Sequence, residues 1–176
     1  IISHCNEAEW NKFKAEHTNE AILDRIVRVN VPYCLEHTQE IKIYKKMLKT
    51  SDFNYHIAPH TLELASMFAV LTRLKPTNKV DQLEKGLIKK VDIKDLREEV
   101  RDEGMTGIST RFVMKSIDNA LADSDKDMIT PISIRESLIK QVKEQITNDE
   151  VRSHYLTFLQ KTLHEEYLKI LEKEIT

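Results

Sequence analysis

The sequence has 176 residues, of which 40% are hydrophobic and 32% are charged. This length accommodates one domain or two small ones, and three glycines and four prolines provide few turns. We therefore expect a mainly helical fold. The net charge of −2 gives no electrostatic reason to expect a nucleic-acid partner. No apolar run approaches the roughly 18 residues of a membrane-spanning helix, so we expect no membrane span.

The two cysteines, Cys5 and Cys34, lack the spacing of a metal-binding or redox pair. Their small number excludes a disulfide framework and fits a reducing compartment, so the expected location is the cytoplasm. We expect no metal site. Residues 1–2 are two isoleucines, typical of the end of a buried strand. We expect the chain to be part of a longer protein.

The N-terminal region predicts short elements. Residues 1–6 are typical of a strand end and residues 7–16 of a short helix. A short helical turn is expected at residues 19–25. Residues 26–31 alternate apolar and polar side chains up to Pro32, which is the strongest strand pattern in the sequence.

The patterns after residue 32 are helical. Thr38 is suited to cap one helix, and Pro59 to occupy the first turn of a second that runs to about residue 74. This second helix is apolar nearly all round, so we expect it to be central and buried. A break follows at residues 75–78, and weaker helical patterns occupy residues 80–90 and 92–100.

The C-terminal part predicts three more helices. Ser109 is placed to cap the first of them, which ends near residue 121. Residues 122–131 are polar and form the best linker candidate. Ser133 with Glu136 matches a capping box for the second helix. Asn148 opens the last helix, which has a broad apolar stripe. The stripe consists of Val151, Tyr155, Phe158, Leu163, Tyr167 and Ile170.

The strongest chemical signal lies in residues 102–112 (DEGMTGISTRF). This segment holds two of the three glycines, followed by the helix-starting serine and by Arg111 in the first helical turn. The helix dipole disfavours a cation at that position by about 0.3–1 kcal/mol, so we expect an anion opposite Arg111 to offset this cost. The alternative is a surface ion pair with Asp102 or Glu103.

Two other polar residues follow apolar segments. Asn6 comes after a strand-like end, where the carboxyl ends of strands line the ligand crevice of open α/β sheets. The alternative role of Asn6 is to cap the helix after it. Arg25 precedes the best strand pattern, where a guanidinium can reach a phosphate on a neighbouring subunit. Its alternative is a salt bridge with Asp24 or Glu20.

Known catalytic motifs are absent from the sequence. It contains no GxxxxGK[ST] phosphate loop, no protein-kinase motifs, and neither HExxH nor GxSxG. No spacing singles out a nucleophile and its base. We therefore expect that the chain does not carry out nucleotide chemistry on its own.

Three segments, in this order, resemble the PrkA family of bacterial serine protein kinases, which carry an AAA+ ATPase module. Residues 1–10 (IISHCNEAEW) resemble its sensor-1 strand. Residues 19–26 (NEAILDRI) and 29–35 (VNVPYCL) resemble its arginine-finger region and last core strand. Residues 102–112 resemble its sensor-2 segment. The resemblance is specific to about residue 122 and looser from there to the end of the chain.

The resemblance implies roles for three residues. Asn6 would be sensor 1, Arg25 the arginine finger, and Arg111 sensor 2, each directed at the phosphates of ATP. The intact protein is expected to use ATP and Mg²⁺, and to self-associate through its AAA+ region. No cofactor is expected in this part of the protein alone, because the family's phosphate loop and metal-binding strand are absent from it.

The resemblance also implies a domain organisation. Residues 1–35 would be the C-terminal remnant of the AAA+ core, residues 36–122 the helical lid, and residues 123–176 a helical extension towards a kinase-like region. The expected fold is mainly α, with one or two short strands. The strands within residues 1–31 would lack their sheet, and would be poorly ordered or pair with another chain.

Two alternatives to a serine protein kinase stay open. The parent protein could be an ATP-dependent protease of a Lon-like kind, since an AAA+ motor suits both activities. The chain could instead be a non-catalytic helical interaction module built on the stripe of residues 148–171.

Overall fold

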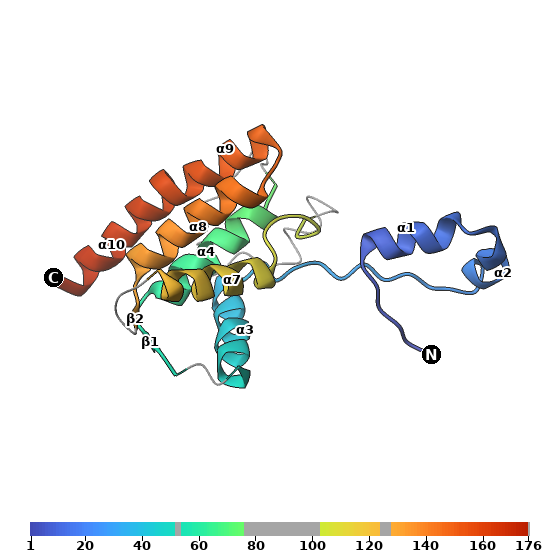
Figure 1. The fold of residues 1–176 in the computed structure, drawn as a ribbon, viewed down its shortest axis with the longest axis horizontal. Helices are drawn as coiled ribbons and strands as arrows, with labels where there is room; N and C mark the ends of the chain where they lie inside the picture. The colour runs from blue at the N-terminus through green and yellow to red at the C-terminus, as the bar shows by residue number, and fades with distance from the viewer. Residues whose placement is uncertain (52–53, 76–102, 124–127, 176) are drawn as a thin grey trace. The chain divides into compact units, whose positions relative to one another are not determined.

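The computed structural model describes residues 1–51, 54–75, 103–123 and 128–175. The chain forms two compact units, Ile1–Val31 and Pro32–Thr176. Most described residues are helical, as the composition predicts, and the strands are short (Figure 1). No helix in the described part of the chain is long and apolar enough to cross a membrane.

The first unit contains α1 (Glu7–Ala15), a 3-10 turn (His17–Asn19) and α2 (Glu20–Leu23). Asn6 caps α1: its side-chain oxygen accepts a bond from the Glu9 amide at 2.8 Å, and its own amide donates to the Glu9 carboxylate at 3.1 Å. This reciprocal pair satisfies amides that a helix start leaves without partners.

The strands expected at residues 1–6 and 26–31 are not formed. Both segments are irregular in the structure, and all of their residues are exposed. Val27 and Val31, which the alternating pattern predicts to be in a sheet, are 88% and 83% exposed. A strand needs a neighbouring strand to complete its backbone hydrogen bonds. No strand in the described ranges pairs with either segment.

The second unit is a helical assembly around α4 (Thr61–Arg73). Every residue of α4 except Glu63 is buried. Helix α4 packs against α3 (His37–Thr50), α7 (Thr110–Ala122) and α8 (Pro131–Gln145), and against the C-terminal helices (Figure 1). This arrangement confirms the expectation that the helix after Pro59 is central.

The C-terminal helices run as one continuous stretch. Helix α9 (Asp149–Thr157) passes through a π-helical segment (Phe158–Thr162) into α10 (Leu163–Ile175). Most of the apolar stripe predicted here packs into the core of the unit. The core holds Tyr44, Phe68, Ile117, Leu138, Leu159 and Leu163, all fully buried. Each such side chain stabilises the fold by roughly 1.5–3 kcal/mol.

One strand of a small parallel sheet lies inside the expected linker of residues 122–131. Strand β1 (His56–Ile57) pairs with β2 (Met128–Ile129), and the Ala58 amide extends the ladder to the Ile129 carbonyl at 2.9 Å. The sheet joins the chain just before α4 to the chain just before α8. Strands of two residues are too short to show a period-two pattern, so the sequence does not reveal them.

The helix starts agree with the sequence in some places and differ in others. Ser109 caps α7 and Asn148 caps α9, as predicted. Helix α3 begins earlier than predicted, with Glu36 at the N-cap, and Thr38 lies inside it. Pro59 precedes α4, whose N-cap His60 has a positive φ of 62°.

Helix α8 also begins earlier than predicted. Its capping box joins Thr130 and Ser133, in place of the predicted Ser133 and Glu136. Pro131 takes the first helical position, where its fixed φ is favourable and its missing amide costs nothing. The helical patterns at residues 80–90 and 92–100 lie outside the described residues.

Candidate functional site

The loop before α7 crosses the C-terminal end of α4. Gly104 and Gly107 both have positive φ, at 78° and 108°. A Cβ on Gly107 would lie 2.6 Å from the carbonyl oxygen of Thr72, so only glycine allows the loop to approach α4 this closely. The two glycines that mark this segment in the sequence therefore have a direct structural cause.

Backbone hydrogen bonds fix the loop on two sides. The Gly104 amide donates to the Arg73 carbonyl at 3.2 Å, and the Tyr33 amide donates to the Gly104 carbonyl at 2.8 Å. The Ile108 amide donates to the Thr72 hydroxyl at 3.0 Å. One loop thus joins the end of α4 to the segment before α3.

Arg73 is the centre of a buried polar network beneath this loop. Its Nε donates to the Ile108 carbonyl at 2.9 Å, its Nη1 to the Cys34 carbonyl at 2.8 Å, and its Nη2 to Glu40 Oε1 at 2.8 Å. The guanidinium also stacks 4.8 Å from the ring centre of Tyr33. Its side chain is 0% exposed, so Arg73 serves structure and is closed to a ligand.

Glu40 connects this network to the start of α7. The Thr110 hydroxyl donates to the same Oε1 atom at 3.1 Å. Burial alone would raise the pKa of Glu40, but the hydrogen bond and charge of Arg73, with the bond from Thr110, bring the pKa below its usual range. Glu40 is therefore a buried carboxylate anion. We call Arg73, Glu40 and Thr110 the buried network.

Sequence reasoning missed the buried network. The available signal was Arg73 itself, a charge in the last turn of a mostly apolar helix whose other charged residue, Glu63, lies in the first turn. A charged residue on a buried helix needs a partner of opposite charge. The sequence does not identify that partner, because Glu40 is 33 residues away along the chain.

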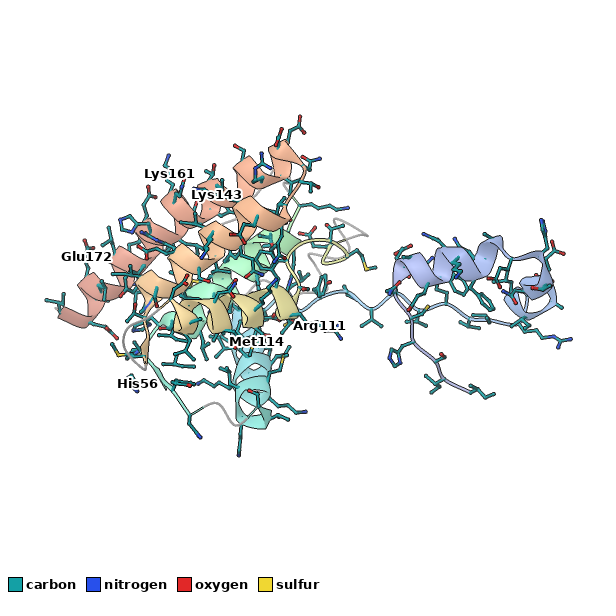
Figure 2. All side chains as sticks on the ribbon, viewed as in Figure 1. His56, Arg111, Met114, Lys143, Lys161 and Glu172 are labelled. Carbon is teal, nitrogen blue, oxygen red and sulfur yellow. The ribbon has the colours of Figure 1, made fainter. Side chains whose placement is uncertain are left out.

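Arg111 lies in the first turn of α7 and is exposed (Figure 2). It makes no hydrogen bond or ion pair with any residue that the structure describes. Of its two expected surface partners, Asp102 lies outside the described ranges. Glu103 is buried and accepts bonds of 3.2 and 3.3 Å from the amide of Lys75.

Two helix N-termini meet beside Arg111. Thr110 is the first residue of α7, and Glu40 lies in the first turn of α3, so their hydrogen bond holds the two helix starts together. Helix N-termini carry partial positive charge, and a free guanidinium next to them adds a full one. The start of α3 already has Glu36 at its N-cap and Glu40 in its first turn, so it is the start of α7 together with Arg111 that favours an anion here.

Asn6 and Arg25 lie in the first unit, all of whose residues are described. The side-chain oxygen of Asn6 is occupied by the capping box, so the alternative reading of Asn6 as a helix cap is confirmed. Arg25 is exposed, and its expected salt bridge with Asp24 or Glu20 is not formed. No hydrogen bond within this unit joins Asn6 to Arg25.

Mg²⁺ prefers oxygen ligands, above all carboxylates. No group of three or more histidine, cysteine or acidic side chains suited to a metal occurs among the described residues.

Comparison with known proteins identifies the relatives of this chain. The PrkA AAA domain matches residues 1–81, and the PrkA serine protein kinase C-terminal domain matches residues 78–176. The ATP-dependent protease PrkA of Bacillus subtilis is 35% identical over 99% of this chain and 30% of its own length. The serine/threonine kinase YeaG of Escherichia coli K12 is 35% identical over 99% of this chain and 29% of its own.

The chain thus spans less than a third of the length of these relatives. No solved structure matches it. The two family matches meet near residue 80, yet α4 from the first match packs directly on α7 and α8 from the second. Both domain matches occur in order and together cover the whole sequence. The chain therefore belongs to the PrkA family.

Proposed function

We propose that this chain is part of the ATP-hydrolysing module of a PrkA-family protein, and that Arg111 contacts the phosphates of ATP as its sensor-2 residue. The supporting observation is an exposed arginine, without a partner among the described residues, beside two helix N-termini that a buried network holds together. Sequence resemblance to the sensor-2 segment agrees with this position.

The chemical task of Arg111 follows from its charge. ATP supplies the phosphoryl group and carries negative charge on its phosphate oxygens. A guanidinium donates two parallel hydrogen bonds to such oxygens. Fixed positive charge at this point also stabilises the charge that develops during phosphoryl transfer. The phosphate loop and the ligands of Mg²⁺ would come from outside this chain, so the chain alone would not hydrolyse ATP.

Asn6 and Arg25 would also act on the phosphates of ATP in the intact protein. Asn6 uses its side-chain oxygen in the capping box, which leaves its amide nitrogen to donate towards a phosphate or a water, as sensor 1 does. The exposure of Arg25 suits an arginine finger that reaches the nucleotide of a neighbouring subunit. The intact protein would then self-associate through its AAA domain.

The proposed division of the chain follows the same scheme. Residues 1–35 belong to the AAA+ core, residues 36–122 to the lid, and residues 123–176 to an extension. The compact unit Pro32–Thr176 contains both lid and extension, so the two would move as one body during the ATP cycle.

The test is Arg111→Ala in the complete protein. We expect ATP turnover to fall by about 10²- to 10³-fold, which is the loss typical of removing one hydrogen-bond donor to the transition state. Lys143→Ala is the matched control, because Lys143 is an exposed cation on α8 (Figure 2). Unchanged nucleotide affinity and unchanged turnover in Arg111→Ala would exclude the sensor role.

The reaction coupled to ATP hydrolysis has two candidates. We propose a cytoplasmic serine/threonine protein kinase, in line with the family description and the name of the Escherichia coli relative. The name of the Bacillus subtilis relative favours an ATP-dependent protease instead. Radiolabelled ATP and casein separate the two, since a kinase labels the casein and a protease releases peptides from it.

The helical interaction module is a weaker alternative. Phe158 and Leu163 of the predicted stripe are buried, and Tyr155, Tyr167 and Ile170 pack against the core. Little of the stripe therefore remains for a partner protein.

A further inference from the structure

We propose that Thr110 and Glu40 are positioning residues for Arg111, and that the buried network sets the place from which this arginine reaches the nucleotide phosphates. The inference rests on the proposed function of Arg111. It assigns a functional role to residues that do not touch the ligand.

The geometry holds the chain on either side of the helix start. Arg73 binds the carbonyl of Ile108 at 2.9 Å, and Glu40 binds the hydroxyl of Thr110 at 3.1 Å. Arg111 is the next residue, and its own side chain is exposed. Hydrogen bonds to Arg73 and Glu40 therefore fix the backbone next to Arg111, while its exposed guanidinium can bind a ligand.

The buried network is suited to hold this position firmly. One carboxylate oxygen, Glu40 Oε1, accepts bonds from both Arg73 and Thr110. The side chains of Arg73 and Glu40 are 0% and 1% exposed, so water does not compete for the bond between them, while Thr110 is half-buried. Hydrogen bonds to a charged group are shorter and stronger than neutral ones.

Thr110 is the member that can be altered without losing the helix. The cap of α7 is Ser109, whose hydroxyl accepts the Phe112 amide at 3.2 Å independently of Thr110. The arginine–glutamate pair also remains when the threonine hydroxyl is removed. Thr110→Val keeps the shape of the side chain and removes only its donor, so the expected change is a looser first turn around Arg111.

The experiment is a double-mutant cycle in the complete protein, with a non-hydrolysable ATP analogue and Mg²⁺ as the probe. Thr110→Val should raise the Kd of the analogue about three- to tenfold, because binding is sensitive to shifts of the order of 1 Å. Thr110→Ser, which keeps the hydroxyl, should restore the Kd to within about twofold. In the Arg111→Ala background, Thr110→Val should have no further effect.

Two controls guard against a structural effect. Thr157→Val makes the same substitution at an exposed site in α9, where the hydroxyl's one bond among the described residues is to the Ser153 carbonyl of its own helix at 3.0 Å. It should bind the analogue as the unaltered protein does. Thermal unfolding of every variant confirms folding, and Thr110→Ala provides the same comparison if valine disturbs the helix start.

The outcomes separate this inference from the proposed function. If Arg111→Ala itself leaves the Kd unchanged, the sensor role fails. If Arg111→Ala weakens binding but Thr110→Val does not, only the positioning role is overturned. It is likewise overturned if Thr110→Val weakens binding equally with and without Arg111.

Discussion

Arg73 and Glu40 form a fully buried ion pair in the second unit, in contrast to ion pairs such as Lys140–Asp123 on its surface. A buried charge is tolerated only with its partner, because each ion loses its hydration when it leaves water. Arg73 also satisfies the carbonyls of Cys34 and Ile108, so its loss would leave these two carbonyls without this donor and Glu40 without its counter-charge. Breaking this pair should therefore be costly.

The first prediction concerns Glu40→Ala in this chain. It should lower the free energy of unfolding by about 3–5 kcal/mol, because it leaves the Arg73 charge buried without a counter-charge. Urea unfolding measures the change. Asp123→Ala is the control, since Asp123 and Lys140 are 62% and 59% exposed and their pair should contribute less than about 1 kcal/mol.

Acid should reproduce part of this effect in the unaltered chain. The folded-state pKa of Glu40 is lowered, so its contribution to stability is present above the unfolded pKa and is lost as the pH falls through the folded value. Glu40→Gln should therefore lose less stability on acidification than the unaltered chain. An equal acid response in both chains would contradict an anionic Glu40.

At the scale of elements, the loop of residues 103–109 depends on two glycines in different ways. A Cβ on Gly104 would meet Leu35 Cδ2 at 3.1 Å and both the Pro32 Cβ and the Tyr33 carbonyl oxygen at 3.2 Å, contacts that a shift of a few tenths of an ångström relieves. A Cβ on Gly107 would meet the backbone of Thr72 at 2.6 Å, and helix backbone does not yield. The same substitution should thus have unequal effects at the two sites.

The second prediction compares Gly107→Ala with Gly104→Ala. Both substitutions require alanine at positive φ, which costs about 1 kcal/mol or more. At Gly107 the clash with α4 should add about 1–3 kcal/mol, so this variant should be clearly the less stable in thermal unfolding. Equal loss of stability in the two variants would show that the loop does not press against α4 as described.

Local signals in the sequence predicted the elements that local forces determine. Ser109 and Asn148 cap helices because a side-chain oxygen at that position satisfies nearby amides, whatever the rest of the chain does. The strand pattern of residues 26–31 failed because a strand also needs a neighbour, which no local pattern provides. Thr38 and Ser133 are not N-caps because α3 and α8 begin two and three residues earlier, after Glu36 and Thr130, and only Thr130 makes a side-chain capping bond.

The sequence predicted the exposed residue of the candidate site, Arg111, but not the buried network that supports it. Two glycines and an arginine at a helix start identified the Arg111 segment. The support beneath it was not predictable, because Arg73, Glu40 and Thr110 come from three separate parts of the chain. Their contacts arise when α3, α4 and α7 pack together, and no spacing rule connects them.

At the scale of the whole molecule, the main hydrophobic cluster of the second unit includes residues from both family matches. A side-chain contact also links the start of α4 to the end of α10. His60 at the start of α4 binds Glu63 at 2.7 Å through Nδ1, and Glu174 near the end of α10 at 2.8 Å through Nε2. His60 and Glu174 are 114 positions apart in the sequence, so their bond is a long-range contact.

The last prediction is that this link makes the stability of the chain depend on pH. Hydrogen bonds to Glu63 and then to Glu174 raise the pKa of His60 above its ordinary value of about 6.5. The charged imidazolium therefore stabilises the fold in full below about pH 6.5, and this contribution is lost as the pH rises through the raised pKa.

His60→Asn isolates this contribution, because asparagine accepts the positive φ of 62° at this position. The unaltered chain should be more stable than the variant near pH 6 by at most about 1 kcal/mol, since Glu174 is 56% exposed and solvent screens the pair. The difference should shrink towards about pH 9. Glu174→Gln should show an intermediate pH dependence, because the bond to Glu63 remains. A difference that stays constant or grows as the pH rises would mean that His60 is not charged in the folded chain.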